Sequence, residues 1–289
     1  MIAVMGAAGN VGSKVADLLV RQGQQVRALE HRRRLDELGR RGAEVVAGDL
    51  DDPGDLGLLL KDVDAALVVL PDVVAEAEFA ATRSRMSRVI ADALRASRVE
   101  HVVALSTVAA GWPDAAVPAA GLRELEQRLA ELQDRHVLVL RSPFYMENLL
   151  AGLPMIRAQG VNGSAIEADL ELPMIATRDV AREAAERLLR RDFSGHRVRL
   201  LVGPEDVSLR AATRALGERL GLPEVGYVQF PPADVQGALM GFGMSEAGAS
   251  AMVELQLGLN RHGGFASVRD TADATTATRL ADFLEEAIR

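Results

Sequence analysis

The sequence predicts an α/β protein with a doubly wound parallel sheet and a smaller, loop-rich C-terminal lobe. As far as Pro143, short and nearly all-apolar segments alternate with amphipathic helical segments, the pattern of strands buried on both faces between helices. A glycine-rich turn joins the first such strand to the first helix. After Pro143 the alternation stops, and Gly, Pro and Met become frequent. The first two observations are typical of a Rossmann-type fold with right-handed crossovers.

The N-terminal part divides into predicted elements in a regular order. Each short apolar run is expected to be a strand, and these runs lie at residues 1–5, 26–29, 43–47, 65–70, 101–105 and 137–140. Between them, apolar side chains recur at helical spacing, at residues 13–21, 55–61, 76–97 and 122–132. Gly23 ends the first helix and Pro71 closes the fourth strand.

The C-terminal part is predicted to hold fewer strands and more irregular backbone. We expect residues 149–172 to be irregular and Thr177 to cap a helix over 178–191. The other predicted elements are a strand at 198–202 and helices at 208–220, in pieces within 231–258, and at 271–288. Residues 1–150 are expected to form a Rossmann domain and residues 151–289 a second lobe, interleaved with the first in one compact unit.

Composition excludes several classes of function. The chain has no cysteine, which excludes disulfides, thiolate catalysis and Cys-ligated metals. A net charge of -8 argues against direct nucleic-acid binding. No His, Asp or Glu cluster has metal-ligand spacing, so no metal is predicted. The first strand begins at residue 1 and no apolar run approaches about 20 residues, so we expect a cytoplasmic protein without a signal peptide or membrane span.

The glycine-rich turn is the strongest functional signal. Glycines between a strand and a helix let the backbone turn sharply and approach a pyrophosphate, while the helix N-terminus attracts the phosphates. The sequence therefore predicts that residues 1–150 bind a dinucleotide and that the second lobe binds the substrate. The turn residues assigned to the dinucleotide are Gly6, Ala8, Gly9, Asn10, Val11 and Gly12.

Residues after the second and third strands leave the choice between NAD and NADP open. Glu30 lies where an acid binds the adenosine ribose hydroxyls, which favours NAD. His31 and Arg32, followed by two more arginines, could hold a 2′-phosphate and favour NADP; alternatively, the arginines form a solvated helix start. Asp49 and the adjacent Leu50 are expected near the adenine, although Asp49 is equally suited to a turn.

The ends of the fourth and fifth strands complete the expected nucleotide site. Ligands of such sheets bind at the carboxyl ends of the strands. Leu70 and Pro71 are therefore expected to line the adenine or ribose, and Ser106 is expected to face the nicotinamide.

Aromatic residues after the strands are the candidates for substrate binding. Trp112 follows the fifth strand, Phe144 and Tyr145 follow the sixth, and Phe265 ends a glycine-rich segment, 260–265, that could form a mobile lid. With the nearby methionines they could line a pocket for a flat aromatic substrate, or they could form the core of the smaller lobe. Tyr145 and His262 are the candidate proton donors, and no catalytic residue is assigned.

The sequence resembles the NmrA-like branch of the atypical short-chain dehydrogenases. The glycine motif, Gly48-Asp49-Leu50, Leu105-Ser106-Thr107, the stretch 140–148 and Thr177–Ala181 carry the resemblance, which covers nearly the whole chain. The resemblance implies either an NAD(P)H-dependent quinone, enone or ether reductase, or a regulator that binds the dinucleotide without turnover. In this family an arginine is common at the position of His31, where it contacts the 2′-phosphate.

The Tyr–Lys pair of the wider superfamily is missing. Neither Tyr145 nor Tyr227 has a lysine four residues later, and Lys14 and Lys61 are the only lysines. Some family reductases have a lysine near the position of Leu122, which this chain also lacks. We therefore expect hydride transfer to a quinone, enone or related aromatic metabolite, with a dinucleotide-sensing regulator or a non-redox enzyme as alternatives. The expected partner is a small aromatic molecule, and a homodimer is left open.

Overall fold

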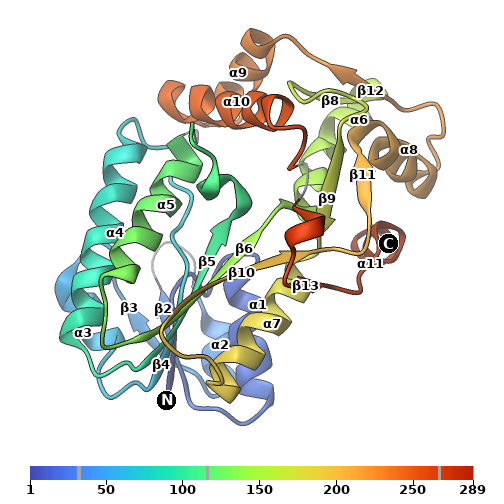
Figure 1. The fold of residues 1–289 in the computed structure, drawn as a ribbon. Coiled ribbons are helices and arrows are strands. Elements are labelled where there is room, and N and C mark those ends of the chain that lie inside the picture. Colours follow the sequence, from blue (N-terminus) through green and yellow to red (C-terminus); the bar gives the residue numbers. More distant parts are fainter. Residues whose placement is uncertain (31–33, 115–116, 266–267, 289) are drawn as a thin grey trace.

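The computed structural model describes residues 1–30, 34–114, 117–265 and 268–288, and a large parallel sheet forms its centre (Figure 1). Within the described residues this sheet has eight strands in the order β13-β10-β6-β5-β4-β1-β2-β3, and all neighbouring strands are parallel. The fold is the predicted doubly wound α/β sheet. Its strands are β1 (Ile2–Val4), β2 (Val26–Glu30), β3 (Glu44–Ala47), β4 (Ala65–Val68), β5 (His101–Thr107), β6 (His136–Ser142), β10 (His196–Val202) and β13 (Ala274–Thr275).

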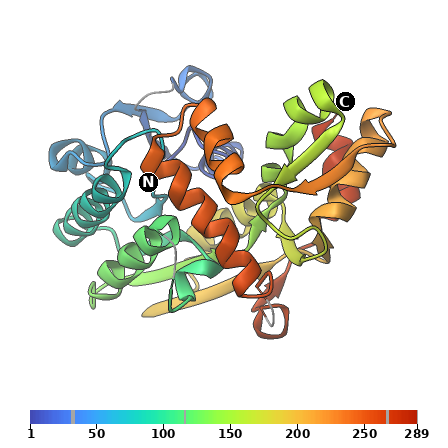
Figure 2. The same cartoon turned by 90° about the horizontal axis from the view of Figure 1, so that it is seen from above.

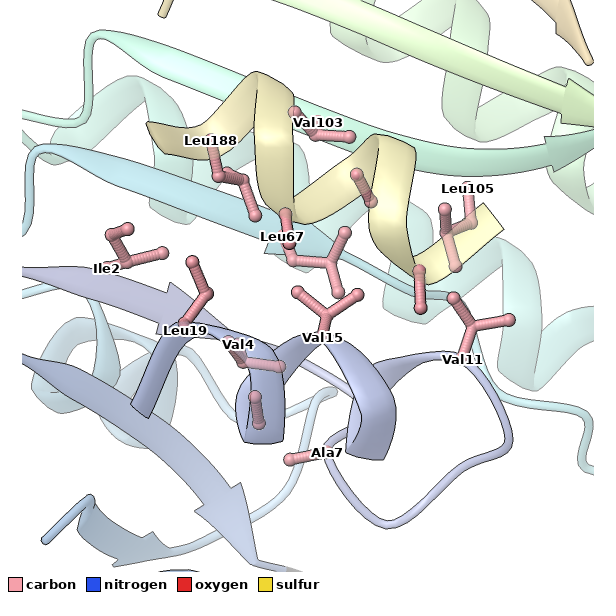
Figure 3. Packing of buried hydrophobic residues seen from close by; sticks show 14 of the residues in the cluster. Ile2, Val4, Ala7, Val11, Val15, Leu19, Leu67, Val103, Leu105 and Leu188 are labelled. Atoms are coloured by element: carbon pink, nitrogen blue, oxygen red, sulfur yellow. The ribbon is translucent and has the colours of Figure 1, made fainter. Parts of the chain in front are cut away.

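Helices cover both faces of the large sheet. One face carries α1 (Gly12–Arg21), α2 (Asp36–Arg40) and α7 (Thr177–Arg190); the other carries α3 (Pro53–Leu59), α4 (Phe79–Ala96) and α5 (Val117–Ala130) (Figure 1). Side chains of β1 alternate between the two resulting cores, with Ile2 and Val4 on the α1 side and Ala3 on the α4 side. Figure 3 shows the first core, in which Val15 and Leu19 of α1 face the sheet.

The smaller lobe is built from short elements around a third hydrophobic core. It has a three-stranded sheet in the order β11-β9-β7 and a two-stranded sheet of β12 and β8. Its strands are β7 (Phe144–Tyr145), β8 (Val161–Ser164), β9 (Glu171–Ile175), β11 (Asp206–Ser208) and β12 (Gly226–Gln229). Its helices are α6 (Leu153–Gln159), α8 (Leu209–Leu220), α9 (Pro232–Gly241), α10 (Glu246–Arg261) and α11 (Leu280–Ala287). Three 3-10 helices complete the description: η1 (Val108–Gly111), η2 (Met146–Gly152) and η3 (Arg269–Thr271).

Several predicted elements of the C-terminal part are wrong in extent. Residues 149–172 were expected to be irregular but contain α6 and β8, because β8 is stabilised by parallel pairing with the distant β12. The predicted helix over 271–288 is limited to α11, since β13 pairs with β10 instead. Thr177 is the first residue of α7 rather than its cap.

The C-terminal part contributes to both lobes. β10, β13 and α7 join the large sheet and its helical layer, although they come after residue 150. The division into a nucleotide-binding and a substrate lobe near that residue stays a prediction. Within the described ranges, no helix is both long and apolar enough to cross a membrane.

Candidate nucleotide and substrate site

The glycine turn lies where the strand order of the sheet reverses. β1 has β4 on one side and β2 on the other, so the crevice at the carboxyl ends of β1 and β4 is the expected ligand site of this fold. Gly6 follows β1 with φ at +67°, and a Cβ there would come within 2.9 Å of the Val69 Cβ. Gly6 therefore permits close contact between the turn and the residue after β4.

The other two glycines of the motif differ in what surrounds them. A Cβ on Gly12 would lie 2.2 Å from the Gly6 carbonyl oxygen, so Gly12 is required by the turn itself. Gly9 donates its N–H to the same oxygen at 2.9 Å and is exposed. Its Cβ would meet only that oxygen, at 3.2 Å. The open side of Gly9 leaves the backbone accessible to a ligand.

The N-terminus of α1 adds the charge complement for a pyrophosphate. Val11 occupies the cap position without a capping side chain, and the first turn holds no acidic residue. The Ser13 N–H donates to the Gly9 carbonyl oxygen at 3.1 Å, and the positive end of the helix dipole, with the other N–H groups of the first turn, is offered to an anion. Lys14 places its ammonium 2.7 Å from the Asn10 carbonyl oxygen, beside the turn. The residues present fit a dinucleotide phosphate.

The residues expected to bind the adenosine make hydrogen bonds with their near neighbours in the chain. The Glu30 carboxylate accepts from the Leu35 N–H at 2.5 Å, and Arg34 pairs with Asp36 at 2.9 Å. His31 and Arg32, with Arg33, lie outside the described residues. Arg34 is thus already neutralised by a carboxylate. The choice between the two dinucleotides stays open.

Asp55 of α3 shapes the turn that contains Asp49. It accepts from the Asp49 N–H at 2.8 Å, and a Cβ on Gly48 would come within 2.6 Å of the Asp55 carboxyl carbon. Leu50 and Leu70 are buried in the core on the α4 side, whereas Pro71, the residue after Leu70, is half-buried. The nucleotide roles of Asp49, Leu50, Leu70 and Pro71 stay predictions.

The loop after β4 is also fixed by the first residues of α10. The Ser245 hydroxyl lies 3.1 Å from the Val74 carbonyl oxygen and 2.8 Å from that of Glu76. A Cβ on Gly248 would lie 2.1 Å from the same Val74 oxygen. In Figure 2, α10 crosses the molecule between the large sheet and the smaller lobe. One helix therefore touches the loop that borders the crevice and reaches the smaller lobe.

Ser106 belongs to a buried polar group that the sequence did not reveal. Its hydroxyl bonds Glu126 of α5, and Arg141 of β6 bonds both oxygens of that carboxylate, at 3.0 and 2.5 Å. Glu126 is only 7% exposed. A charged residue on an amphipathic helix is ordinarily expected to face solvent, so spacing alone gave no signal for this pair.

The stretch 140–148, on which the family resemblance depends, is partly structural. Glu147 caps α7: its two carboxylate oxygens accept from the Thr177 N–H, each at 3.1 Å. Met146 is buried in the core of the smaller lobe. Phe144 and Tyr145, which were expected only to follow the sixth strand, form a strand of their own, β7, which pairs with β9. Because successive side chains of a strand point to opposite faces, the two rings separate.

Tyr145 packs on the side of the nucleotide turn. Its ring lies against the core that also contains Ala7 and Val11, whereas Phe144 packs into the core of the smaller lobe. Burial raises the pKa of the Tyr145 phenol to about 12, with Glu147 adding to the rise and the neighbouring Ser142 hydroxyl opposing it. The phenol is therefore protonated at neutral pH.

Trp112, His262 and Phe265 form a stacked aromatic group. The Trp112 ring centre lies 4.4 Å from that of His262 and 5.2 Å from that of Phe265. His262 Nε2 lies 2.6 Å from Asp114 Oδ1, and this bond is the largest cause of the lowered pKa of Asp114. Trp112, Phe144 and Phe265 share one hydrophobic cluster, so the structure brings three of the four substrate candidates together.

The predicted lid, 260–265, is anchored at several points. The Asn260 amide bonds the Ala165 carbonyl at 2.9 Å and its carbonyl accepts from the Glu167 N–H at 3.0 Å. Gly263, Gly264 and Phe265 all have positive φ values, of +60°, +64° and +69°. In the described part of the chain, no group of His, Asp or Glu side chains is arranged to hold a metal ion.

Comparison with known proteins identifies the family. The model of the NmrA-like family matches residues 1–285. The chain belongs to this family. It is 31% identical over 289 residues to an NAD(P)H azoreductase of Xenophilus azovorans, covering 99% of this chain and 96% of that protein. The resemblance predicted from the glycine motif and from residues 140–148 is thus confirmed.

Solved structures share the fold at lower sequence identity. An NADPH-dependent quinone oxidoreductase from Escherichia coli, in complex with NADPH, superposes with a TM-score of 0.82 at 24% identity, covering 100% of both chains. The triphenylmethane reductase of Citrobacter sp., in complex with NADP(H), has a TM-score of 0.78 at 18% identity, covering 99% of this chain and 100% of that one. At these identities the likeness supports the fold.

Proposed function

We propose that this protein is an NAD(P)H-dependent reductase that transfers hydride to a flat, electron-poor aromatic acceptor of the quinone or azo class. The observation that carries the proposal is the open Gly9 backbone beside the uncapped N-terminus of α1, at the β1–β4 reversal of the sheet. A relative that shares its family and 31% of its sequence is an NAD(P)H azoreductase. Reduced nicotinamide, when bound, supplies the hydride.

The chain lacks the Tyr–Lys proton donor, and this lack favours an acceptor that needs no strong acid. Tyr145 is followed four residues later by Leu149 and Tyr227 by Pro231, so no lysine is available to lower the pKa of either phenol. Quinones accept hydride without a strong acid, so orientation and proximity supply most of the rate, whereas an azo acceptor also needs a proton for its nitrogens. Trp112, Phe144 and Phe265 offer the apolar cluster against which a flat acceptor could bind.

Tyr145 is the proton donor that we favour over His262. Its ring packs against the core that contains the glycine turn, so the phenol lies on the nucleotide side of the molecule. His262 is instead stacked on Trp112 and bonded to Asp114. Tyr145→Phe is expected to lower kcat about 10²-fold for an azo substrate, whose nitrogens must be protonated, and less for a quinone.

The test is a titration followed by turnover. Titration calorimetry with NADPH, NADH and their oxidised forms measures binding, and the loss of nicotinamide absorbance with a quinone, an azo dye and a triphenylmethane dye measures turnover. Tight binding of the reduced form with acceptor-dependent oxidation supports the reductase. Equal affinity for both redox states without turnover by any acceptor refutes it in favour of a dinucleotide-sensing protein.

A further inference from the structure

The buried group of Ser106, Glu126 and Arg141 determines which way the Ser106 hydroxyl points its proton. Arg141 Nε lies 3.0 Å from Glu126 Oε1, and Arg141 Nη2 lies 2.5 Å from Oε2. Arg is always charged in proteins, and a carboxyl group that it holds at two points is a carboxylate. A carboxylate has no proton to donate. In its bond to Glu126, Ser106 is therefore the donor.

The hydroxyl is left with acceptor capacity alone. A serine hydroxyl has one proton and two lone pairs, and the proton is used by Glu126. None of the described residues donates to the Ser106 oxygen. The loop after β5 closes over Arg141, since a Cβ on Gly111 would lie 3.1 Å from the Arg141 Nη1. The Glu126 carboxylate is buried, whereas Arg141 is partly exposed, and Arg141 holds both carboxylate oxygens in place.

Ser106 lies on the nicotinamide side of the crevice. It is the last residue but one of β5, and β5 is the neighbour of β4 on the side away from β2. With the adenosine expected at Glu30 of β2 and the pyrophosphate at α1, the other half of the dinucleotide extends toward β4 and β5. The donor that a nicotinamide ring presents there is the N–H pair of its carboxamide.

We infer that Ser106 accepts a hydrogen bond from the nicotinamide carboxamide and is a specificity residue for the dinucleotide, while Glu126 and Arg141 are its positioning residues. This inference rests on the proposed nucleotide-dependent function. It assigns Ser106 a role opposite to that of an acid, because a hydroxyl without a free proton cannot protonate or polarise the acceptor. Any protein-derived proton must then come from elsewhere, which agrees with Tyr145 as the donor.

The test compares a dinucleotide with its 3-acetylpyridine analogue, which keeps the ring carbonyl and both riboses but has no amide N–H. Calorimetric dissociation constants are measured with oxidised NADP or NAD, whichever binds more tightly, and with the matching analogue. We expect the wild type to bind the carboxamide form about tenfold more tightly, the scale of one hydrogen bond. Ser106→Ala is expected to reduce this ratio to below about twofold.

Two further variants make the result specific. Ser87→Ala removes a buried hydroxyl of α4 that has no hydrogen-bond partner, and it should keep the tenfold ratio. Glu126→Ala removes the carboxylate that holds the serine proton. The freed hydroxyl can then donate to the ring carbonyl of either ligand, so this variant should bind the acetyl analogue as tightly as the carboxamide form. Circular dichroism establishes that each variant is folded before its ratio is measured.

The outcomes separate this inference from the proposed function. An unchanged ratio in folded Ser106→Ala, or a wild type that does not distinguish the two ligands, overturns the role of Ser106 while leaving nucleotide binding in place. A contact to a ribose hydroxyl would give that unchanged ratio, because both ligands carry the riboses. Absence of binding by every dinucleotide would instead refute the proposed function and this inference with it.

Discussion

Gly9 can be changed to separate nucleotide binding from folding. Its Cβ would meet only the Gly6 carbonyl oxygen, at 3.2 Å, so the Cβ of Gly9→Ala or Gly9→Val needs a shift of only a few tenths of an ångström. A shift of that size should cost at most about 1 kcal/mol, which is less than about 2 °C in Tm for a chain of this length. Gly12→Ala is the structural contrast, since its Cβ would lie 2.2 Å from the same backbone oxygen and the turn would have to open.

The added side chain at Gly9 occupies the space that the phosphates would approach. We expect Gly9→Val to weaken dinucleotide binding at least 100-fold, which is about 2.7 kcal/mol, with Gly9→Ala between it and the wild type. Calorimetry gives the dissociation constant, and a thermal melt of the same sample gives Tm. A Gly9→Val protein that melts like the wild type and binds NADPH with unchanged affinity would refute the placement of the pyrophosphate at this turn.

Three other predictions concern stability. Glu147→Ala should remove the cap of α7 and cost about 1–2 kcal/mol, a Tm loss of roughly 2–3 °C. The partly exposed α7 variant Glu186→Ala should change Tm by less than about 1 °C, and equal losses would contradict the capping role. Burial raises the pKa of both Tyr145 and Tyr227 to about 12. Their protonated phenols therefore contribute fully to stability below pH 10, and this contribution is lost between pH 10 and 12. Absorbance at 295 nm follows the phenolate, and phenolate in the folded protein at pH 10 would contradict the prediction. The hydrogen bond from the N-terminal amine lowers the pKa of Asp64 below 3.8. The Tm difference between wild type and Asp64→Asn should therefore be present at pH 6 and should vanish as the pH falls below 3.8. A difference that persists at pH 2 would argue against this ion pair.

The sequence predicts the large sheet well because its signals are local. The run Met1–Met5 followed by Gly6 and Gly12 shows a buried strand, a turn and a helix within a short window, and the structure confirms them. The extent of the C-terminal elements depends on pairing between distant segments. β8 needs β12 and β13 needs β10, and neither pairing leaves a trace in the periodicity of the shorter segment.

The candidate site divides in the same way. The glycine turn is predicted from Gly6, Gly9 and Gly12 because backbone geometry demands that residue type. Glu126 and Arg141 could not be found, because their contact depends on α5 packing across the ends of β5 and β6. The separation of Phe144 from Tyr145 also required the structure, since β7 exists only through its pairing with β9.

Helix α10 joins the two halves of the expected reaction site. Its N-cap residue Ser245 holds the loop after β4, and near its other end a Cβ on Gly258 would lie 3.0 Å from the Trp112 ring. A helix of 16 residues is about 24 Å long and moves as a rod. A nucleotide that displaced the β4 loop would therefore shift the stacked group of Trp112, His262 and Phe265. Such linkage is reciprocal. An acceptor that binds more tightly to the nucleotide-loaded protein must raise the affinity of the protein for the nucleotide by the same factor, through slower release, faster binding or both.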